Sequence, residues 1–362
     1  MDRISNQWRV IDTGLRRAAE NLAINKAMLE AHQAGEIPHT LRFLQFKPSA
    51  LLGFHQSAEQ ELLIDYCHAQ EIDIQRRITG GGAIYFDPSQ IGWELYLDKK
   101  FLGTADMALV AKRICEAAAD GMRRLGVDAQ FRPRNDIEVN GRKISGTGGA
   151  FDGDSILYQG TLLVDFDVAK MLRILRIPAE KLSDKAIDSA RDRVANLKGL
   201  LGKAPSIDEV KKHMTAAFGE AFSIEFEQSD ALTEVEQTKY QQALAEIDSP
   251  EWIFQHDRPA SETETVNGIY RSAGGLMRVS IYLDTAKERI KQVWITGDFF
   301  VNPKRMIVDL EAALRHTLVS EIAQNVSLFF QDYPADMLLL TADDFVQLFN
   351  GALAKQAEAS TA

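Results

Sequence analysis

The sequence has little of what marks a disulfide-stabilised or membrane-spanning protein. Its 362 residues include only two cysteines, Cys67 and Cys115, which match neither a disulfide framework nor a metal-binding spacing. No apolar run approaches the length of a transmembrane helix, and the first residues, MDRISNQWRV, lack the apolar region of a signal peptide. These absences predict a soluble cytoplasmic protein with no membrane partner.

Positive charge is also scarce over the chain as a whole. The formal net charge is -11, which argues against a general nucleic-acid-binding protein, because such proteins carry a basic surface. One segment is locally positive, and four of its cations lie near a glycine cluster: Arg132, Arg134, Arg142 and Lys143. For these four, a solvated surface and an anion site remain equally open.

The sequence does contain enough apolar residues, 45%, to fill the cores of one large domain and a smaller one. Apolar residues at helical spacing predict helices at 15–34 and 105–125, and Ser206 is a candidate N-cap of a helix that ends at Phe222. The segments LRFLQF, IDIQRRI, IGWELYL and SILYQGTLLVDF are typical of strands. A sheet with surrounding helices, an α+β fold, is therefore expected.

A polar, helical stretch that ends near Pro250 is typical of a connector between domains. Beyond it, segments 277–284 and 289–295 alternate in polarity on either side of a four-residue turn, as the strands of a hairpin do. Apolar residues then recur at helical spacing over 306–322. We expect a catalytic domain over residues 1–248 and a smaller α+β accessory domain over residues 249–362.

Three consecutive glycines, Gly80, Gly81 and Gly82, follow Arg76 and Arg77 and separate two predicted strands. They do not open a helix, and no GxxxxGK[ST] motif exists, so neither common nucleotide-binding motif is present. The simplest interpretation is a wide turn. Because neighbouring strand residues point to opposite faces, only one arginine can face the loop, where it would form an anion site with free backbone N–H groups.

A second glycine-rich segment is NDIEVNGRKISGTGG, in which the pair Asn140-Gly141 predicts a tight hairpin turn. Lys143 follows the turn, and such a lysine standing alone would be interpreted as a solvated edge residue. Two glycine-rich segments, each with a cation, are what a site needs to bring a carboxylate against a polyphosphate, because the cations offset the repulsion between the anions.

Four segments resemble the motifs of A-type lipoate-protein ligases. RRITGGGAIYFD is similar to RRxSGGGxVYHD, and RPRNDIEVNGRKISGTGG is similar to GRNDxxxxGxKxSGSA, which contains an essential lysine. YQGTLL resembles HHGTLL, and KAIDSARDRVANL resembles KGxxSVxSRVxNL. PEWIF and ITGDFF correspond to segments in the accessory domain of the long ligases, so the resemblance covers about residues 15 to 330 in the same order.

The resemblance implies the mixed-sheet fold shared with biotin ligases and octanoyltransferases. It also implies a two-step reaction with ATP, Mg²⁺ and lipoate. ATP activates the lipoate carboxylate as lipoyl-AMP with release of pyrophosphate. A lysine of a lipoyl-acceptor protein then attacks the mixed anhydride, and no enzyme nucleophile is required.

The resemblance also assigns roles to individual residues. Lys143 matches the catalytic lysine that touches the carboxylate and the α-phosphate, and Asn135 and Asp136 match a pair near the phosphate and the metal, with Asp136 the candidate Mg²⁺ ligand. The segment that wraps the adenylate is matched by Arg77, Thr79, Gly80, Gly81 and Gly82, and the acyl tunnel by Gly160 and Thr161. The remaining expected substrate-binding residues are Arg76, Ala83, Tyr85, Ser145, Gly146 and Thr147.

Several positions depart from the family motifs. Phe86 replaces the histidine of VYHD, Tyr158 and Gln159 replace the two histidines of HHGTLL, and Ala150 stands where many members have arginine. These departures predict a specialised substrate or acceptor. Acceptors in the family are lipoyl domains, glycine-cleavage H-type proteins and lipoate-binding proteins of sulfur oxidation.

Two other functions remain open. An octanoyl- or lipoyltransferase of the same fold works through a cysteine thioester, but the segments in which that cysteine is expected contain none, and Cys67 and Cys115 lie on predicted helices, where a buried apolar role is commoner. A non-catalytic lipoyl-binding protein is the other alternative. The presence of Lys143 and of all three glycines at 80–82 argues against it.

Overall fold

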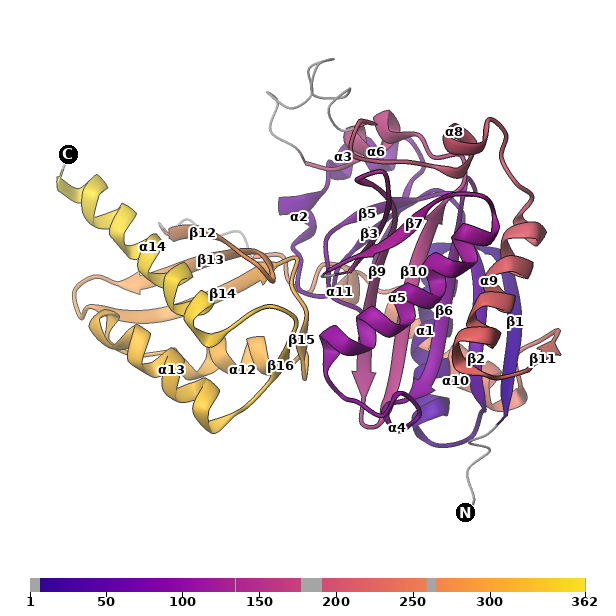
Figure 1. Ribbon diagram of the computed structural model, residues 1–362. Helices are drawn as coiled ribbons and strands as arrows, with labels where there is room; N and C mark the ends of the chain where they lie inside the picture. The colour runs from indigo at the N-terminus through magenta and orange to yellow at the C-terminus, as the bar shows by residue number, and fades with distance from the viewer. Residues whose placement is uncertain (1–6, 134, 177–190, 259–264, 362) are drawn as a thin grey trace. The chain divides into compact units, whose positions relative to one another are not determined.

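The computed structural model describes residues 7–133, 135–176, 191–258 and 265–361 (Figure 1). The chain forms two compact units. The first unit contains the residues up to Leu52, Ala58–Thr79 and Ala83–Gln255, and the second contains Gly53–Ser57, Gly80–Gly82 and the residues from His256 onward. The second unit therefore includes two short segments from the first quarter of the sequence.

The first unit is built on an eight-stranded sheet in the order β11-β1-β2-β6-β10-β9-β8-β7. β1 pairs in parallel with β2 and β11, and the other pairs are antiparallel, so the sheet is mixed and the predicted fold class is confirmed. The strands are β1 (Trp8–Arg16), β2 (His39–Phe46), β6 (Gln90–Asp98), β7 (Ala129–Arg132), β8 (Asp136–Val139), β9 (Arg142–Asp152), β10 (Ser155–Leu163) and β11 (Phe226–Ser229).

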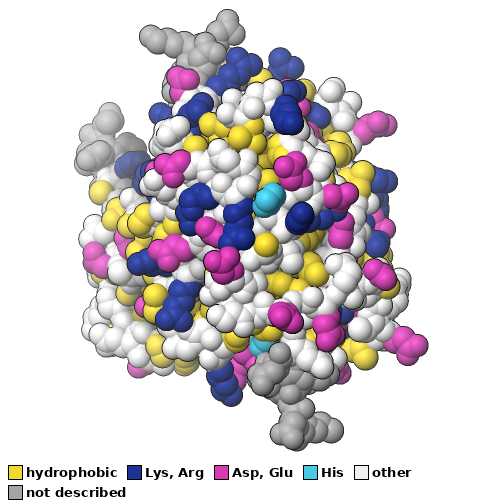
Figure 2. All heavy atoms as spheres, turned by 45° about the vertical axis from the view of Figure 1, so that its right-hand side comes forward, with side chains coloured by type: hydrophobic (Ala, Val, Ile, Leu, Met, Phe, Trp, Pro, Cys, Tyr) yellow, Lys and Arg dark blue, Asp and Glu magenta, His cyan; other side chains and the backbone are white. Residues whose placement is uncertain are grey.

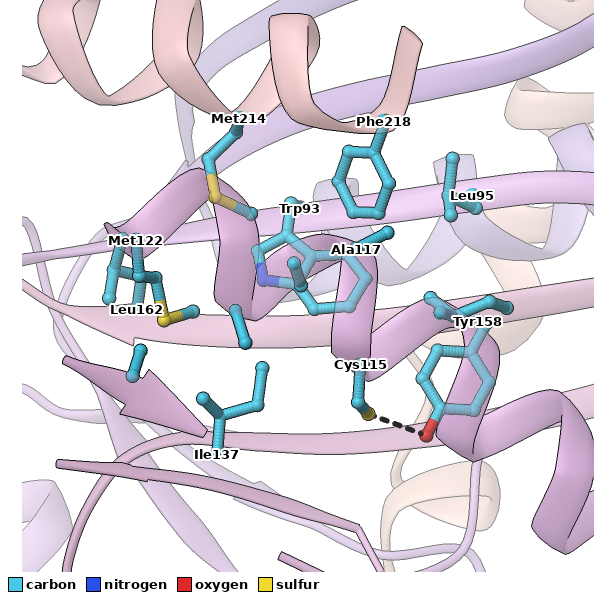
Figure 3. Packing of buried hydrophobic residues seen from close by; sticks show 14 of the residues in the cluster. Trp93, Leu95, Cys115, Ala117, Met122, Ile137, Tyr158, Leu162, Met214 and Phe218 are labelled. Carbon is cyan, nitrogen blue, oxygen red and sulfur yellow. Dashed lines mark hydrogen bonds between the residues drawn. The ribbon is translucent and has the colours of Figure 1, made fainter. Parts of the chain in front are cut away.

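Two apolar cores hold helices against this sheet. Helices α5 (Met107–Arg124) and α9 (Ile207–Phe222) pack in one core, around Trp93 and Tyr158 of the strands (Figure 3). Helices α1 (Ala18–Gln33) and α10 (Glu234–Ile247) pack in the other. The helix at 105–125 and the Ser206 N-cap, whose hydroxyl accepts from the Glu209 N–H, are confirmed.

A smaller three-stranded sheet, in the order β4-β3-β5, carries the arginine segment. Its strands are β3 (Ser49–Leu52), β4 (Asp73–Arg76) and β5 (Ile84–Phe86). Short helices complete the first unit: α2 (Ala58–Glu61), α3 (Ile64–Ala69), α4 (Lys99–Leu102), α6 (Val168–Ile174), α8 (Leu197–Leu201) and α11 (Pro250–Ile253). The predicted order of strand, glycine loop and strand at 76–86 is thus confirmed.

The polar helical stretch before Pro250 is not a connector. Helix α10 packs on α1 and buries Tyr240, Ala243 and Ile247. Pro250 begins α11, which is held to β4 because Trp252 Nε1 donates to the Arg76 carbonyl at 3.0 Å. The contacts therefore divide the chain after Gln255, somewhat later than the boundary expected after residue 248.

The second unit contains an antiparallel sheet, β12-β13-β14, whose strands are β12 (Val266–Ser272), β13 (Gly275–Asp284) and β14 (Arg289–Gly297). Its core also includes α12 (Met306–Ala313), α13 (Ile322–Asp332) and α14 (Ala342–Thr361). The remaining elements are a two-stranded sheet of β15 (Val301–Asn302) and β16 (Asp336–Met337) and a 3₁₀ turn (Val319–Glu321). The predicted hairpin of 277–284 and 289–295 is confirmed.

Two helix predictions were wrong in extent. The helix expected over 306–322 is two helices, because the intervening chain pairs with β14: the His316 N–H donates to the Ile290 carbonyl at 2.8 Å, and the Ile290 N–H to the Thr317 carbonyl at 3.0 Å. The helix expected from residue 15 begins at Ala18, because Leu15 lies in β1 and pairs with Gln45 of β2.

Among the residues that the structure describes, no helix has the length and apolar character needed to cross a bilayer. Figure 2 shows a face on which acidic and basic side chains are interspersed. On helix α5, Arg124 forms ion pairs with Asp120 of the same helix at 3.0 Å and with Glu220 of α9.

Candidate functional site

The β8–β9 hairpin carries the lysine predicted to be catalytic. Its turn residues, Asn140 and Gly141, have φ values of 51° and 73°, which is the left-handed conformation that an Asn-Gly hairpin turn requires. Lys143 Nζ lies 2.6 Å from Asp136 Oδ1, and the lysine side chain is 43% exposed. The hairpin thus joins the two residues that sequence reasoning placed at the phosphate.

The backbone of Lys143 is fixed from its other side by a segment of a third motif. The Lys143 N–H donates to the Arg193 carbonyl at 2.9 Å, and the Ala195 N–H donates to the Lys143 carbonyl at 2.8 Å. Lys143 and Val194 form a parallel bridge. The RVANL part of that motif therefore supports the lysine, whereas its residues 185–190 lie outside the described residues.

Gly146 lies beside the lysine side chain. A Cβ at Gly146 would lie 2.9 Å from Lys143 Nζ and 3.0 Å from Cε, so a larger residue would displace the side chain. The Gly146 N–H donates to Thr161 Oγ1 at 3.2 Å. These contacts bring residues of two predicted groups, the lysine segment and the YQGTLL strand, to one place in the sheet.

Asn135 is held tightly to β9. Its Nδ2 donates to the Thr147 carbonyl at 2.6 Å, and its own carbonyl accepts both the Thr147 N–H at 2.8 Å and the Thr147 hydroxyl at 2.9 Å. Since Asp136 follows directly, these bonds also fix the start of β8. The nearby Ser145 hydroxyl is buried and has no hydrogen-bond partner among the described residues.

Arg77 and Thr79 form a second polar group. Arg77 Nε donates to Thr79 Oγ1 at 3.3 Å, and Nη1 donates to the Leu51 carbonyl at 2.8 Å. Gln159 Nε2 of β10 also donates to Thr79 Oγ1, at 3.2 Å, so this segment lies beside the strand that carries Gly160 and Thr161. Burial lowers the pKa of Arg77 to about 10, which still leaves a cation at neutral pH.

Arg76 points elsewhere. Its Nε donates to the Trp252 carbonyl at 3.1 Å and to the Ile253 carbonyl at 3.0 Å, so it anchors α11. Ala83 and Tyr85 pack in the apolar core of the smaller sheet, where the Tyr85 ring lies 6.5 Å from that of Phe166. Arg76 is thus bonded to α11, and Ala83 and Tyr85 lie in an apolar core, so we do not include these three residues in the proposed site.

The three glycines belong to the second unit, and two of them differ sharply in surroundings. A Cβ at Gly80 would lie 2.4 Å from the Phe299 carbonyl oxygen, and the Gly81 N–H donates to that same oxygen at 3.4 Å. A Cβ at Gly82 would meet nothing closer than Asp298 Cβ at 3.7 Å. Close approach of another backbone segment therefore requires glycine at position 80 and leaves position 82 unconstrained.

Gly160, expected in an acyl tunnel, contacts an indole ring. A Cβ there would lie 2.2 Å from Cζ2 of Trp93, whose ring is almost fully buried. Trp93 Nε1 has no hydrogen-bond partner among the described residues. Glycine at 160 thus gives Trp93 its place in the apolar core.

Both cysteines are buried. Burial raises the pKa of Cys67, on α3, and of Cys115, on α5, to about 11. Cys115 Sγ lies 3.4 Å from the Tyr158 hydroxyl (Figure 3). It also lies 3.4 Å from Thr147 Oγ1. Neither thiol is in the state in which a cysteine acts as a nucleophile.

Asp136 is the residue predicted to bind a metal ion. Among the described residues, no group of three or more His, Cys, Asp or Glu side chains could hold a metal ion. Mg²⁺ in nucleotide sites is usually held by one or two carboxylates together with the substrate phosphates. A single carboxylate, such as that of Asp136, is compatible with a magnesium ion that arrives with ATP.

Sequence reasoning missed the contacts behind the hairpin. Tyr158, noted only as a departure from the motif, donates or accepts through its hydroxyl at 2.9 Å from Thr147 Oγ1. The Asn135–Thr147 pairing was also not predicted. A small polar residue alternating with glycines on a predicted strand was the one signal for an inward-facing hydroxyl at Thr147.

The chain is similar in sequence to lipoate-protein ligases and to octanoyltransferases. Lipoate-protein ligase A subunit 1 of Thermoplasma acidophilum is 31% identical over 60% of this chain and 84% of its own. The lipoate-protein ligase LplJ of Bacillus subtilis is 27% identical over 91% of this chain and 95% of its own. The octanoyltransferase LipM of Kyrpidia tusciae is 27% identical over 68% of this chain and 98% of its own.

Solved structures agree with this relationship. A bipartite lipoate-protein ligase of Thermoplasma acidophilum, described with its E2 lipoyl domain, matches 70% of this chain and 99% of its own with a TM-score of 0.64 and 28% identity. A lipoate-protein ligase A bound with ATP matches 69% of this chain and 98% of its own with a TM-score of 0.60 and 26% identity. The family model described as lipoyl protein ligase A/B catalytic domain matches residues 17–219, more than half of the chain. This enzyme therefore belongs to the lipoyl protein ligase A/B family, whose members include lipoate-protein ligases and octanoyltransferases.

Proposed function

We propose that this protein is an ATP-dependent lipoate-protein ligase. It joins lipoate to the α-phosphate of ATP and then transfers the lipoyl group to a lysine of an acceptor protein. The observation that carries the choice of ligase over octanoyltransferase is the state of the two cysteines. A thioester route needs an accessible thiolate, and both thiols of this chain are buried with pKa values raised to about 11.

In the first step, a carboxylate oxygen of lipoate attacks the α-phosphorus of ATP, and the bond from that phosphorus to the pyrophosphate oxygen breaks. Lys143 neutralises the attacking carboxylate and the α-phosphate. Its side chain is accessible, and the ion pair with Asp136 fixes its position. Asn135 fixes the start of β8. We propose that Arg77, which donates to Thr79 Oγ1, balances the adenylate phosphate.

Mg²⁺, when bound with ATP, would neutralise phosphate charge, with Asp136 as its protein ligand. Gly146 leaves the space that the lysine side chain occupies, and Thr161 holds the Gly146 N–H in place. Thr79, Gly80, Gly81 and Gly82 stay proposed as the loop beside the adenylate.

In the second step, the amine of the acceptor lysine attacks the lipoyl carbonyl carbon. The bond from that carbon to the phosphate oxygen breaks, AMP leaves, and the amine loses a proton. We propose that the acceptor is a small lipoyl-carrier protein: a lipoyl domain, a glycine-cleavage H-type protein or a lipoate-binding protein of sulfur oxidation. The relative from Thermoplasma acidophilum, described with an E2 lipoyl domain, supports this class of partner. We also propose that the reaction takes place in the cytoplasm.

We further propose that the second unit is an accessory domain that assists activation. Adenylation has to exclude water from a reactive anhydride, whereas transfer has to admit a protein-borne lysine, so the two steps favour different arrangements. The contacts of Gly80–Gly82 group this loop with the second unit, which supports a role for that unit in activation.

An exchange assay tests the proposal. With lipoate and Mg²⁺ present, the enzyme should incorporate labelled pyrophosphate into ATP, because formation of lipoyl-AMP is reversible. The alternative, favoured by the resemblance to LipM proteins, is octanoyl transfer through a thioester. Mass spectrometry after incubation with an octanoyl-carrier protein would then find the acyl group on Cys67 or Cys115, and exchange would be absent.

A further inference from the structure

Behind the β8–β9 hairpin, a chain of hydrogen bonds runs from helix α5 to Asn135. Cys115 Sγ lies 3.4 Å from the Tyr158 hydroxyl, which lies 2.9 Å from Thr147 Oγ1. The Thr147 hydroxyl in turn lies 2.9 Å from the Asn135 carbonyl. Three of these residues, Cys115, Tyr158 and Thr147, are buried.

Each hydroxyl has a single proton, and this determines which group donates and which accepts in each hydrogen bond of the chain. A threonine hydroxyl has one proton, and Thr147 donates it to the Asn135 carbonyl, which cannot donate in return. The Tyr158 hydroxyl must therefore donate to Thr147 Oγ1. The Cys115 thiol is left to donate to an oxygen, which suits a thiol that keeps its proton.

The chain of hydrogen bonds ends on Asn135, the residue directly before Asp136. The Asn135 carbonyl accepts both the hydroxyl and the backbone N–H of Thr147, and Asn135 Nδ2 returns a bond to the Thr147 carbonyl. Asp136, the next residue, forms the ion pair with Lys143. The Tyr158 hydroxyl is thus two hydrogen bonds from the backbone of Asn135, the residue before Asp136.

We propose that Tyr158 is a positioning residue for adenylation: its hydroxyl orients Thr147, which fixes Asn135 and, through Asp136, the place of Lys143. This inference rests on the proposed ligase activity for its kinetic consequence, but not for its structural one. Filling space is not the reason for a tyrosine here, because a phenylalanine ring would make the same contacts with Trp93, 6.4 Å away between ring centres. A buried hydroxyl is unfavourable unless it is bonded.

The structural part is tested by NMR on the full-length protein. The Asn135 side-chain amide resonance is identified by its disappearance in Asn135→Asp. It should shift in Tyr158→Phe, because Thr147 loses the donor that orients it. The matched control is Tyr240→Phe, a buried tyrosine of α10 in the other core, and it should leave the resonance in place. An unchanged Asn135 resonance in folded Tyr158→Phe would overturn the proposal.

The kinetic part is tested by lipoate-dependent pyrophosphate exchange. Tyr158→Phe should lower the exchange rate roughly tenfold per folded molecule, the effect of one disrupted hydrogen bond, while Tyr240→Phe keeps the wild-type rate. Thr147→Val, which removes the next hydroxyl, should lower the rate at least as much. The double variant should be no slower than Thr147→Val alone, because both changes break one chain.

The outcomes of these experiments test the positioning role of Tyr158 separately from the ligase assignment. Additive losses in the double variant, or a wild-type rate in Tyr158→Phe, would contradict the positioning role, since general loss of stability has no reason to be confined to one chain. If the wild-type enzyme shows no exchange at all, the ligase assignment fails, and the NMR comparison alone then supports or overturns the role of Tyr158.

Discussion

Lys143 Nζ and Asp136 Oδ1 lie 2.6 Å apart across the β8–β9 hairpin, and the register shift between Ile137 and Glu138 lies between them. The ion pair holds the lysine where the glycine at 146 leaves room for it. Both side chains are partly exposed, so the pair contributes little to stability, about 1 kcal/mol or less.

Lys143→Ala is therefore expected to abolish chemistry without unfolding the protein. Loss of a charge that stabilises the transition state should lower pyrophosphate exchange by roughly 10²-fold or more. Arg142→Ala is the matched control, because it removes a partly exposed cation from the adjacent position of the same strand. Exchange by Lys143→Ala at the Arg142→Ala rate would show that the lysine is not catalytic.

The glycine loop offers a pair of substitutions with opposite expectations. Gly80→Ala should lower the melting temperature, because its Cβ would lie 2.4 Å from a backbone oxygen that cannot move aside cheaply. Gly82→Ala should be close to neutral in stability, because its Cβ meets nothing within 3.4 Å. Thermal unfolding followed by circular dichroism compares the two, and equal melting temperatures would contradict the close approach of Phe299.

Features determined by neighbouring residues could be predicted from the sequence, whereas features that depend on distant segments could not. The Asn140-Gly141 turn and the Ser206 N-cap were predictable because local residues determine them. The division between α12 and α13 was not, since it depends on pairing with β14, and neither was the reason for glycine at 80, which depends on Phe299. The residues around Lys143 were predictable as a group from the motifs, but their partners, Thr147 for Asn135 and Tyr158 for Thr147, are set by strand register and burial.

A buried ion pair in the first unit should be important for stability. Arg42 Nη1 lies 2.9 Å from Glu94 Oε2, both side chains are almost fully buried, and Asn25 Nδ2 also donates to Glu94. Arg42→Met should destabilise the protein by about 3–5 kcal/mol, because it leaves a buried carboxylate without its cation. Arg305→Met, at the exposed pair with Asp309, should leave stability almost unchanged. Urea unfolding measures both variants, and similar losses would contradict the argument.

The stability of the second unit should depend on pH because of the buried carboxyl group of Glu311. Burial raises its pKa to about 7, opposed by the bond from the Ile295 N–H and by the charge of Arg315. A carboxyl with a raised pKa stabilises the fold most below its unfolded pKa, near 4.5, and that contribution is lost as the pH rises through 7. The loss should amount to roughly 3 kcal/mol.

Glu311→Gln should remove this dependence, because glutamine does not titrate. The free energy of unfolding of the variant, relative to that of wild type, should be larger at pH 8 than at pH 5. Urea unfolding at both pH values measures it. A constant difference between the two proteins across that range would show that Glu311 has an ordinary pKa.

Activation of lipoate with ATP is tested by incorporation of labelled pyrophosphate into ATP by the wild-type protein with Mg²⁺, with and without lipoate. We expect exchange that depends on lipoate, needs no acceptor protein and is at least roughly 10²-fold slower in Lys143→Ala. No exchange by the folded wild-type protein, together with an octanoyl group found on Cys67 or Cys115 after incubation with an octanoyl-carrier protein, would contradict it.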